Sequence, residues 1–228
     1  QELFEKDIKV LSLFFIDEVA KYRRYNPDGK GEYAEIFEQE YTDIIKHLDF
    51  SLFNQPEYID YLKSTVASKA HEGYFSKDRK GKLINSKTER RTKESADEEA
   101  YDLIMKNKER LLDRKEPIRF IFSHSALREG WDNPNVFQIC TLKQSSAEVR
   151  KRQEVGRGLR LCVNGQGERM DVNVLGEEMH RVNLLTVIAS ESYESFAKGL
   201  QTEMAEAIAD RPQKVTIQLF KGKTLRLP

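Results

Sequence analysis

Four short apolar runs constrain the fold of this 228-residue chain more than any other feature of its sequence. Each run is rich in Val, Ile, Leu and Phe, and none alternates regularly with polar residues. Strands of this composition are typical of a parallel sheet that is covered on both faces. The runs are KVLSLFFI (9–16), IRFIF (118–122), VFQICTL (136–142) and NLLTVIA (183–189).

Segments with a helical pattern lie between and after the apolar runs. Pro56 suits the first turn of a helix, and Pro117 prevents a helix from continuing into the second run. Alternation of strands and helices predicts an α/β domain with right-handed crossovers. The expected helices cover 17–24, 35–48, 56–71, 97–112, 145–155 and 193–208.

Two further segments are interpreted as β-hairpins. The first is the basic stretch 73–91, which would turn near Gly81. The second is 214–227 at the end of the chain, which would turn near Gly222. We therefore expect a basic hairpin inserted in the α/β domain and a second hairpin at its C-terminal end.

The domain organisation follows from these elements. Residues 1–212 are expected to form one domain, and 213–228 to be a terminal β-hairpin or the start of a following module. The chain has no initiator Met and enters its first apolar run almost at once. This beginning predicts a piece of a longer polypeptide.

The composition places the chain among cytoplasmic proteins without naming a partner. Lys plus Arg and Asp plus Glu each number 38, so net charge alone favours no ligand. Cys140 and Cys162 sit in or beside apolar runs, which indicates buried free thiols and not a disulfide framework. No apolar run approaches the ~20 residues that cross a bilayer, and no signal peptide is visible, so we expect no membrane contact.

Charge is nevertheless distributed unevenly along the chain. Residues 28–49 hold seven acids and two lysines, whereas 76–93 hold eight bases and two acids. Residues 143–169 hold seven bases and three acids. Two basic blocks favour an anionic partner, although a solvated surface, or a mobile hairpin for 76–93, remains the alternative.

The stretch LSLFFIDE (11–18) has the form of a Walker B strand, in which terminal acidic residues hold Mg²⁺. That interpretation requires a phosphate loop upstream, and G-x-x-x-x-G-K-[ST] occurs nowhere in the chain. A strand that leads into a short helix, with Asp17 near the helix N-terminus, is therefore favoured.

A stronger signal is FIFSHSALREGWDNPNVFQICTL (120–142), a buried strand followed by a loop. Ligands of open α/β sheets bind in such loops, at the carboxyl ends of the strands. Gly130 permits close approach of the backbone, and Asp132 offers an acceptor for a hydroxyl group or a cation. Asn133 and Pro134 turn the chain toward the next strand. Taken alone, the loop could also be a simple turn.

The basic stretch VRKRQEVGRGLRL (149–161) follows the next strand. Arg157 and Arg160 are three residues apart, so on a helical turn they project from neighbouring faces. A planar guanidinium group matches the oxygens of a phosphoryl group and stabilises charge that develops on them. The pair therefore indicates phosphate binding.

Together, SALREGWDNPNVF and RQEVGRGLRL resemble motifs V and VI of superfamily 2 helicases and translocases. These two sequences, and the stretch 97–132, are similar to sequences of the Res subunit of type III restriction endonucleases. KVLSLFFIDEVAKYR (9–23) resembles the first strand of the second RecA-like domain of that family. The resemblance covers most of 9–189 and implies a RecA-like fold of the P-loop NTPase type.

The resemblance also implies roles in nucleotide binding. Gln153, Gly156, Arg157 and Arg160 match the Q-x-x-G-R-x-x-R core of motif VI. Both arginines would reach across a cleft to the γ-phosphate of ATP on the first RecA-like domain, with Arg160 as the arginine finger.

The resemblance also implies that motif V and the basic blocks take part in nucleic-acid binding. Gly130 and Asp132 match the G-x-D of motif V, which couples the nucleotide to the nucleic-acid track and touches the ribose. His124 stands where many of these helicases have a phosphate-contacting Thr, and a His can donate a hydrogen bond there. The other expected DNA contacts are Lys80, Lys82, Lys143, Arg150 and Lys151.

The same comparison identifies parts that the sequence lacks: a Walker A loop, a credible motif II, motif III and the nuclease signature. ATP and Mg²⁺ would then be held mostly by the first RecA-like domain of the same polypeptide, and this chain alone would be inactive. The implied partners are double-stranded DNA and the methyltransferase (Mod) subunit. Another superfamily 2 DNA helicase, or a non-catalytic protein-interaction module of the same fold, remains the alternative.

Overall fold

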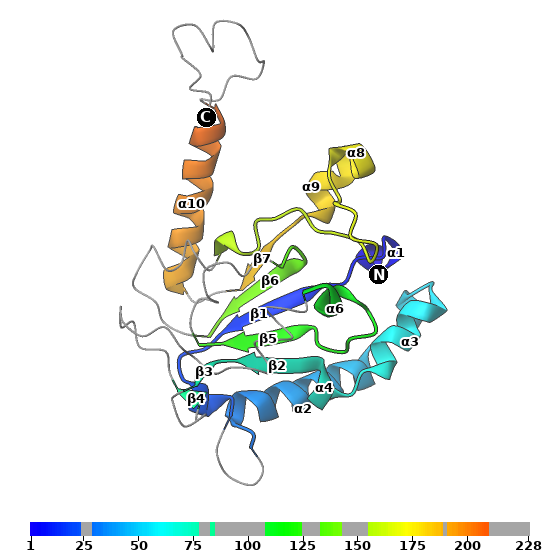
Figure 1. Cartoon of the computed structure of the whole chain (residues 1–228), viewed down its shortest axis with the longest axis vertical. Coiled ribbons are helices and arrows are strands. Elements are labelled where there is room, and N and C mark those ends of the chain that lie inside the picture. The colour runs from blue at the N-terminus through cyan, green and yellow to red at the C-terminus, as the bar shows by residue number, and fades with distance from the viewer. Residues whose placement is uncertain are drawn as a thin grey trace, which may run out of the picture.

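The computed structural model describes residues 1–23, 29–77, 83–84, 108–124, 133–142, 155–188 and 191–209. Their centre is a five-stranded sheet in the order β2-β5-β1-β6-β7, in which all neighbours are parallel (Figure 1). This sheet, flanked by helices, confirms the prediction of a RecA-like α/β fold. The strands are β1 (Leu11–Phe15), β2 (His71–Tyr74), β5 (Phe120–Ser123), β6 (Val136–Thr141) and β7 (Thr186–Ile188).

Each of the four predicted apolar runs overlaps with one strand, and β1 lies at the centre of the sheet. Leu13 of β1 is opposite Ile121 of β5 on one side and Ile139 of β6 on the other. The chain moves from β1 outward to β2, returns through β5, and crosses β1 to reach β6. In such sheets, ligands bind outside the carboxyl ends of the strands where the direction of winding reverses.

Helices lie along the β2 side of the sheet, and α10 projects away from it beyond β7 (Figure 1). The predicted helices 35–48 and 193–208 are confirmed as α2 and α10. The described part of the predicted helix 17–24 forms only a short 3₁₀ turn. The helices are α1 (Glu2–Glu5), α2 (Glu32–His47), α3 (Pro56–Ser64), α4 (Ala67–Ala70), α6 (Lys108–Leu112), α8 (Val172–Leu175), α9 (Met179–Val182) and α10 (Glu191–Ala209), with 3₁₀ turns η1 (Val19–Lys21), η2 (Phe50–Leu52) and η4 (Gly176–Glu178).

Among the described helices, none combines the length and the apolar character that crossing a membrane requires.

The single helix predicted for 56–71 is wrong, because the chain leaves the helical conformation between α3 and α4. Thr65 and Val66 are extended, and both are β-branched residues that favour extended backbone. The guanidinium group of Arg119 donates to the carbonyl oxygen of Tyr61 at 3.1 Å and also to the hydroxyl oxygen of Thr65. Arg119 thus binds a carbonyl group that a continuous helix would use itself.

The strand β2 was not predicted, and the hairpin expected from residue 73 begins later. His71–Tyr74 forms a parallel ladder with β5, so Gly73 belongs to the main sheet. The basic hairpin itself is confirmed as β3 (Ser76–Lys77) and β4 (Leu83–Ile84), which pair antiparallel. The start of helix 97–112, most of 145–155 and the terminal hairpin 214–227 lie outside the described residues.

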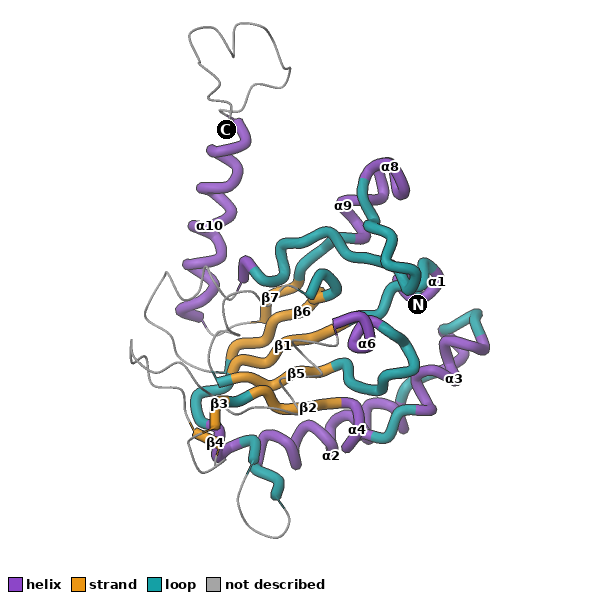
Figure 2. The backbone as a smooth tube through the Cα atoms, viewed as in Figure 1, coloured by secondary structure: helices purple, strands orange, loops and turns teal. Residues whose placement is uncertain are grey.

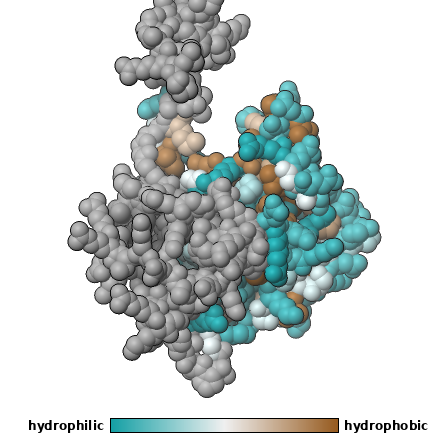
Figure 3. Space-filling view, in the orientation of Figure 1, coloured by the Kyte–Doolittle hydropathy of each residue, from teal (hydrophilic) through white to brown (hydrophobic). Residues whose placement is uncertain are grey.

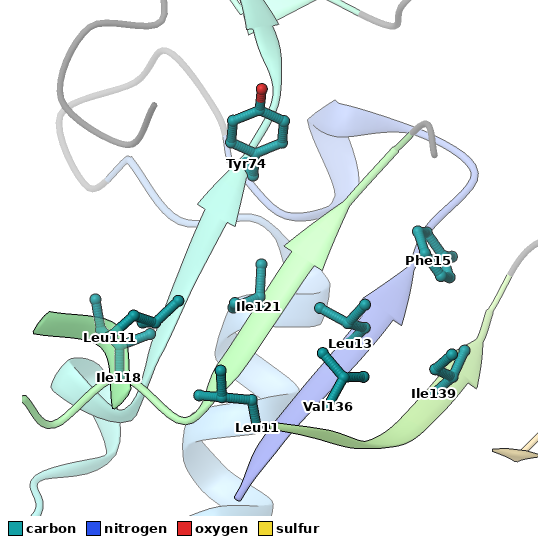
Figure 4. Packing of buried hydrophobic residues seen from close by; sticks show 9 residues of the cluster. All are labelled: Leu11, Leu13, Phe15, Tyr74, Leu111, Ile118, Ile121, Val136 and Ile139. Carbon is teal, nitrogen blue, oxygen red and sulfur yellow. The ribbon is translucent and has the colours of Figure 1, made fainter. Parts of the chain in front are cut away.

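Both faces of the sheet are covered at its central strands, as the apolar runs predicted, whereas Thr186 and Ile188 of the edge strand β7 are exposed. One face carries the cluster drawn in Figure 4, in which Leu11, Leu13 and Phe15 of β1 are at most 1% exposed. On the other face, Phe122 of β5 packs with the buried part of α2 around Ala34. A third cluster lies under the region of α8 and α9 and consists of Ile8, Phe137, Cys162, Met170 and Val182.

A buried lysine lies at the amino end of β1. Lys9 is 1% exposed, and its ammonium group donates to the carbonyl oxygens of Asp113 (2.8 Å) and Glu116 (2.6 Å). Burial lowers the pKa of Lys9 to about 7, against a smaller opposing influence of the Glu116 carboxylate. Lys9 therefore fixes the turn that leads from α6 into β5.

Candidate phosphate-binding site

Residues 155–163 carry the two arginines of the predicted phosphate site and pass the outer strand of the sheet. The first residues are helical, and Arg157 and Gly158 form a turn. The chain then runs past β7 toward the N-terminal end of the molecule (Figure 2). There the amide of Gly165 donates to the carbonyl oxygen of Asp7 at 2.8 Å. The segment is thus attached to the domain beyond the arginines.

The two glycines that flank Arg157 have different surroundings. A Cβ atom on Gly158 would lie 2.4 Å from Cδ1 of Leu185, so close packing against the residue before β7 favours glycine. A Cβ atom on Gly156 would meet no atom of the described residues within 4 Å. Packing therefore accounts for Gly158, whereas Gly156 borders open space that a ligand could enter.

The side chain of Asn135 holds the segment after the arginines. Its amide nitrogen donates to the carbonyl oxygen of Val163 (2.9 Å), and its oxygen accepts the Val163 amide (2.8 Å). The carbonyl oxygen of Asn135 accepts the amide of Leu11 at the start of β1 (2.9 Å). Because Asn135 is only 1% exposed, these bonds connect the segment rigidly to the centre of the sheet.

A second asparagine holds the neighbouring residue. Asn183 accepts the amide of Cys162 (2.8 Å) and donates to the carbonyl oxygens of Met170 and Met179, both at 2.9 Å. Sequence reasoning identified neither this residue nor Asn135 as part of the site. The only signal was an amide side chain next to a turn, which many surface asparagines share.

Arg160 is the more accessible of the two arginines. It is exposed, whereas Arg157 is half-buried. Nη1 of Arg160 donates to the carbonyl oxygen of Arg157 at 2.7 Å. Arg160 also lines an open hollow of about 460 Å³, together with Pro134. A guanidinium group has five N–H donors in a planar fork, so this bond leaves donors that an oxyanion could accept from.

His124 and Arg160 belong to opposite ends of the sheet. His124 directly follows β5, so it lies at the carboxyl end of the strands, where nucleic-acid contact was expected. Pro134, which shares the hollow with Arg160, precedes β6 at the amino end. The structure therefore does not bring His124 and the hollow at Arg160 together in one site.

The carboxylate of Asp17 is bound by groups of the protein, so its position does not require a metal ion. Its carboxylate forms an ion pair with Lys21 at 2.5 Å and accepts the amide of Glu18 at 3.0 Å. Burial alone would raise the pKa of Asp17, but the hydrogen bond and charge of Lys21 outweigh burial and lower it. Within the described ranges, no group of three His, Cys, Asp or Glu side chains could hold a metal.

Neither cysteine is disulfide-bonded, as predicted, and neither has the character of a nucleophile. Cys162 is buried next to the arginine segment, and burial raises the pKa of its thiol to about 11. Burial also raises the pKa of the half-buried Cys140. Because the thiolate is the reactive form, both are packing residues.

Most of the other predicted site residues lie outside the described residues, and their roles stay predictions. They are the motif V pair Gly130 and Asp132, the motif VI residue Gln153, and the basic residues Lys80, Lys82, Lys143, Arg150 and Lys151.

Comparison with known proteins relates the chain to one group of enzymes. It is 44% identical over 162 residues to the EcoPI Res subunit of Escherichia phage P1 and 45% identical over 163 residues to the EcoP15I Res subunit of Escherichia coli. It is 39% identical over 176 residues to the StyLTI Res subunit of Salmonella typhimurium strain LT2. All three are subunits of type III restriction-modification enzymes.

These similarities cover 69%, 69% and 72% of the chain, but only 15%, 15% and 17% of the respective relatives. No protein-family model matches the chain.

Proposed function

This chain is homologous to part of the Res subunits of type III restriction-modification enzymes, and on that basis we propose that it is the second RecA-like domain of an ATP-dependent DNA translocase. In this function, motifs V and VI couple ATP hydrolysis to movement on double-stranded DNA. The observation that carries the proposal is the presentation of Arg157 and Arg160 on one short segment, which Asn135 holds at Val163.

The arginines complete a nucleotide site whose other half is the first RecA-like domain. ATP and Mg²⁺ are held mostly by that domain, and Arg160 inserts its guanidinium group toward the γ-phosphate. Its exposure and its remaining donors support this role. A positive group at that position stabilises the charge of the transferring phosphoryl group, an effect of about 10³-fold or more in turnover.

The surface around the arginines suits contact with another domain. Leu159 is 49% exposed, and Leu184 and Ile188, which flank and end β7, are 65% and 57% exposed. In Figure 3, apolar side chains gather between the lower part of α10 and the region of α8 and α9. Exposed apolar groups next to a charged site are characteristic of an interface.

Nucleic acid is bound at the carboxyl ends of the strands, where His124 follows β5. His124 and a set of basic residues contact the DNA backbone, which positions the duplex without reading its sequence. These basic residues are Lys80, Lys82, Lys143, Arg150 and Lys151. The Mod subunit supplies sequence recognition, and the intact restriction subunit supplies the nuclease.

The test is DNA-stimulated ATP hydrolysis by the full polypeptide that contains this chain, assembled with its Mod partner. Arg160→Ala should reduce turnover by about 10³-fold or more while binding of a labelled duplex is retained. Arg181→Ala is the matched control, because Arg181 is an exposed arginine that pairs with Glu2 and Glu178. Full turnover by Arg160→Ala would exclude the proposed finger.

A further inference from the structure

A short hairpin after the arginine segment fixes the position of another arginine. Val163 and Arg169 face each other in an antiparallel bridge, and the amide of Met170 donates to the carbonyl oxygen of Cys162 at 2.8 Å. Because Cys162 and Met170 are both buried, the base of the hairpin is part of the hydrophobic core. The backbone of Arg169 is therefore held in place relative to Val163.

The tip of this hairpin is equally well determined. The side-chain oxygen of Asn164 accepts the amides of Gln166 (3.1 Å) and Glu168 (2.9 Å). Gly167 has a φ of +79°, a conformation that favours glycine. The side-chain nitrogen of Asn164 donates to the carboxylate of Glu168 at 3.1 Å, so this acid has a partner within the hairpin tip.

Arg169 and Arg160 line the same hollow of about 460 Å³. The other described residues that line it are Pro134, Leu161 and Val163, so the described part of its wall contains two cationic side chains and no acid. Among the described residues, no carboxylate forms an ion pair with either arginine. Two like charges that face one cavity without an acid favour binding of an anion between them.

We propose that Arg169 and Arg160 bind the same phosphate group, and that Arg169 is a second phosphate-binding residue outside motif VI. The assignment rests on the proposed function, in which this phosphate belongs to ATP on the first RecA-like domain. Arg160 approaches from the turn and Arg169 from the hairpin, so the phosphate oxygens are contacted from two sides. DNA also carries phosphate groups, and the experiment must distinguish these two sources.

The experiment compares Arg169→Ala, Arg169→Lys and the control Arg181→Ala in the full polypeptide with its Mod partner. Two quantities are measured: the KM and kcat of DNA-stimulated ATP hydrolysis, and the affinity for a labelled duplex. A lost charge-assisted hydrogen bond should raise the KM for ATP by about 10-fold or more in Arg169→Ala. Arg169→Lys should recover part of the loss, because it keeps the charge but not the planar fork.

The outcomes separate this inference from the proposed function. A raised KM for ATP with unchanged duplex affinity supports a nucleotide phosphate in the hollow. A loss of duplex affinity alone, or kinetics equal to those of Arg181→Ala, overturns it. If Arg160→Ala abolishes turnover while Arg169→Ala has no effect, only the role of Arg169 fails. If Arg160→Ala is fully active, the proposed function itself fails. Thermal unfolding midpoints equal to wild type confirm that the variants are folded.

Discussion

The centre of the sheet and its β7 edge are built by different interactions. At the centre, Leu11, Leu13 and Phe15 are at most 1% exposed and pack against β5 and β6. At the edge, Leu184 and Ile188 are more than half exposed, and hydrogen bonds hold the neighbouring segment. The comparison teaches that burial of apolar surface determines the fold, whereas directed polar contacts determine where the arginines are presented.

The largest expected difference is in the free energy of unfolding that is lost when a core leucine or an edge leucine is truncated. Leu13→Ala should lower the free energy of unfolding by about 3 kcal/mol, because it leaves a cavity between three strands. Leu184→Ala removes the same atoms from a residue that is 65% exposed and should change stability by less than about 0.5 kcal/mol. Urea denaturation measures both. Equal losses would show that the edge leucine is packed as tightly as the core.

The next effect concerns the asparagine that connects the arginine segment to the sheet. Asn135→Ala leaves the amide and the carbonyl group of Val163 without their partner and should cost about 2 kcal/mol. Asn173, which is exposed, is the control, and Asn173→Ala should lower the free energy of unfolding by only about a few tenths of a kcal/mol. If Asn135→Ala matched its control, the hydrogen bonds would not be what holds the segment.

The free energy of unfolding should depend on pH through Lys9, which is buried at the amino end of β1. Lys9 in the folded chain has a pKa of about 7, against 10.5 in the unfolded chain. Between these values the unfolded chain binds more protons, so the contribution of Lys9 to stability rises with pH, by at most about 1.4 kcal/mol per pH unit. Unfolding measured from pH 7 to 10 should therefore show a slope that Lys9→Met reduces. The arginines of the edge keep their charge over this range.

The smallest expected effect on stability comes from adding a methyl group at Gly156 or Gly158, and it should differ between these two glycines. Gly158→Ala must displace the end of the Leu185 side chain and should cost about 1 kcal/mol. Gly156→Ala meets open space and should not destabilise the fold. Under the proposed function, Gly156→Ala should nevertheless slow ATP hydrolysis, because the added methyl group would occupy the space of the ligand. Unfolding and hydrolysis, measured on the same variants, test this separation.

The sequence was sufficient for the central sheet because its strands are apolar on both faces. It failed for β2, whose residues His71–Tyr74 include a charged residue and a glycine. That strand is specified by its ladder with β5, a contact distant in sequence. In the same way, Arg157 and Arg160 could be found from their spacing. Asn135 and Asn183 could not, because their importance depends on which backbone groups the fold brings beside them.

The position of His124 and Arg160 at opposite ends of parallel strands has a mechanical consequence. A strand of about five residues spans roughly 17 Å, and close-packed interiors are hardly compressible. The sheet therefore connects His124 and Arg160 rigidly. Under the proposed function, a displacement of the arginines by phosphate would reach the DNA side as motion of a rigid body, with little of it absorbed on the way.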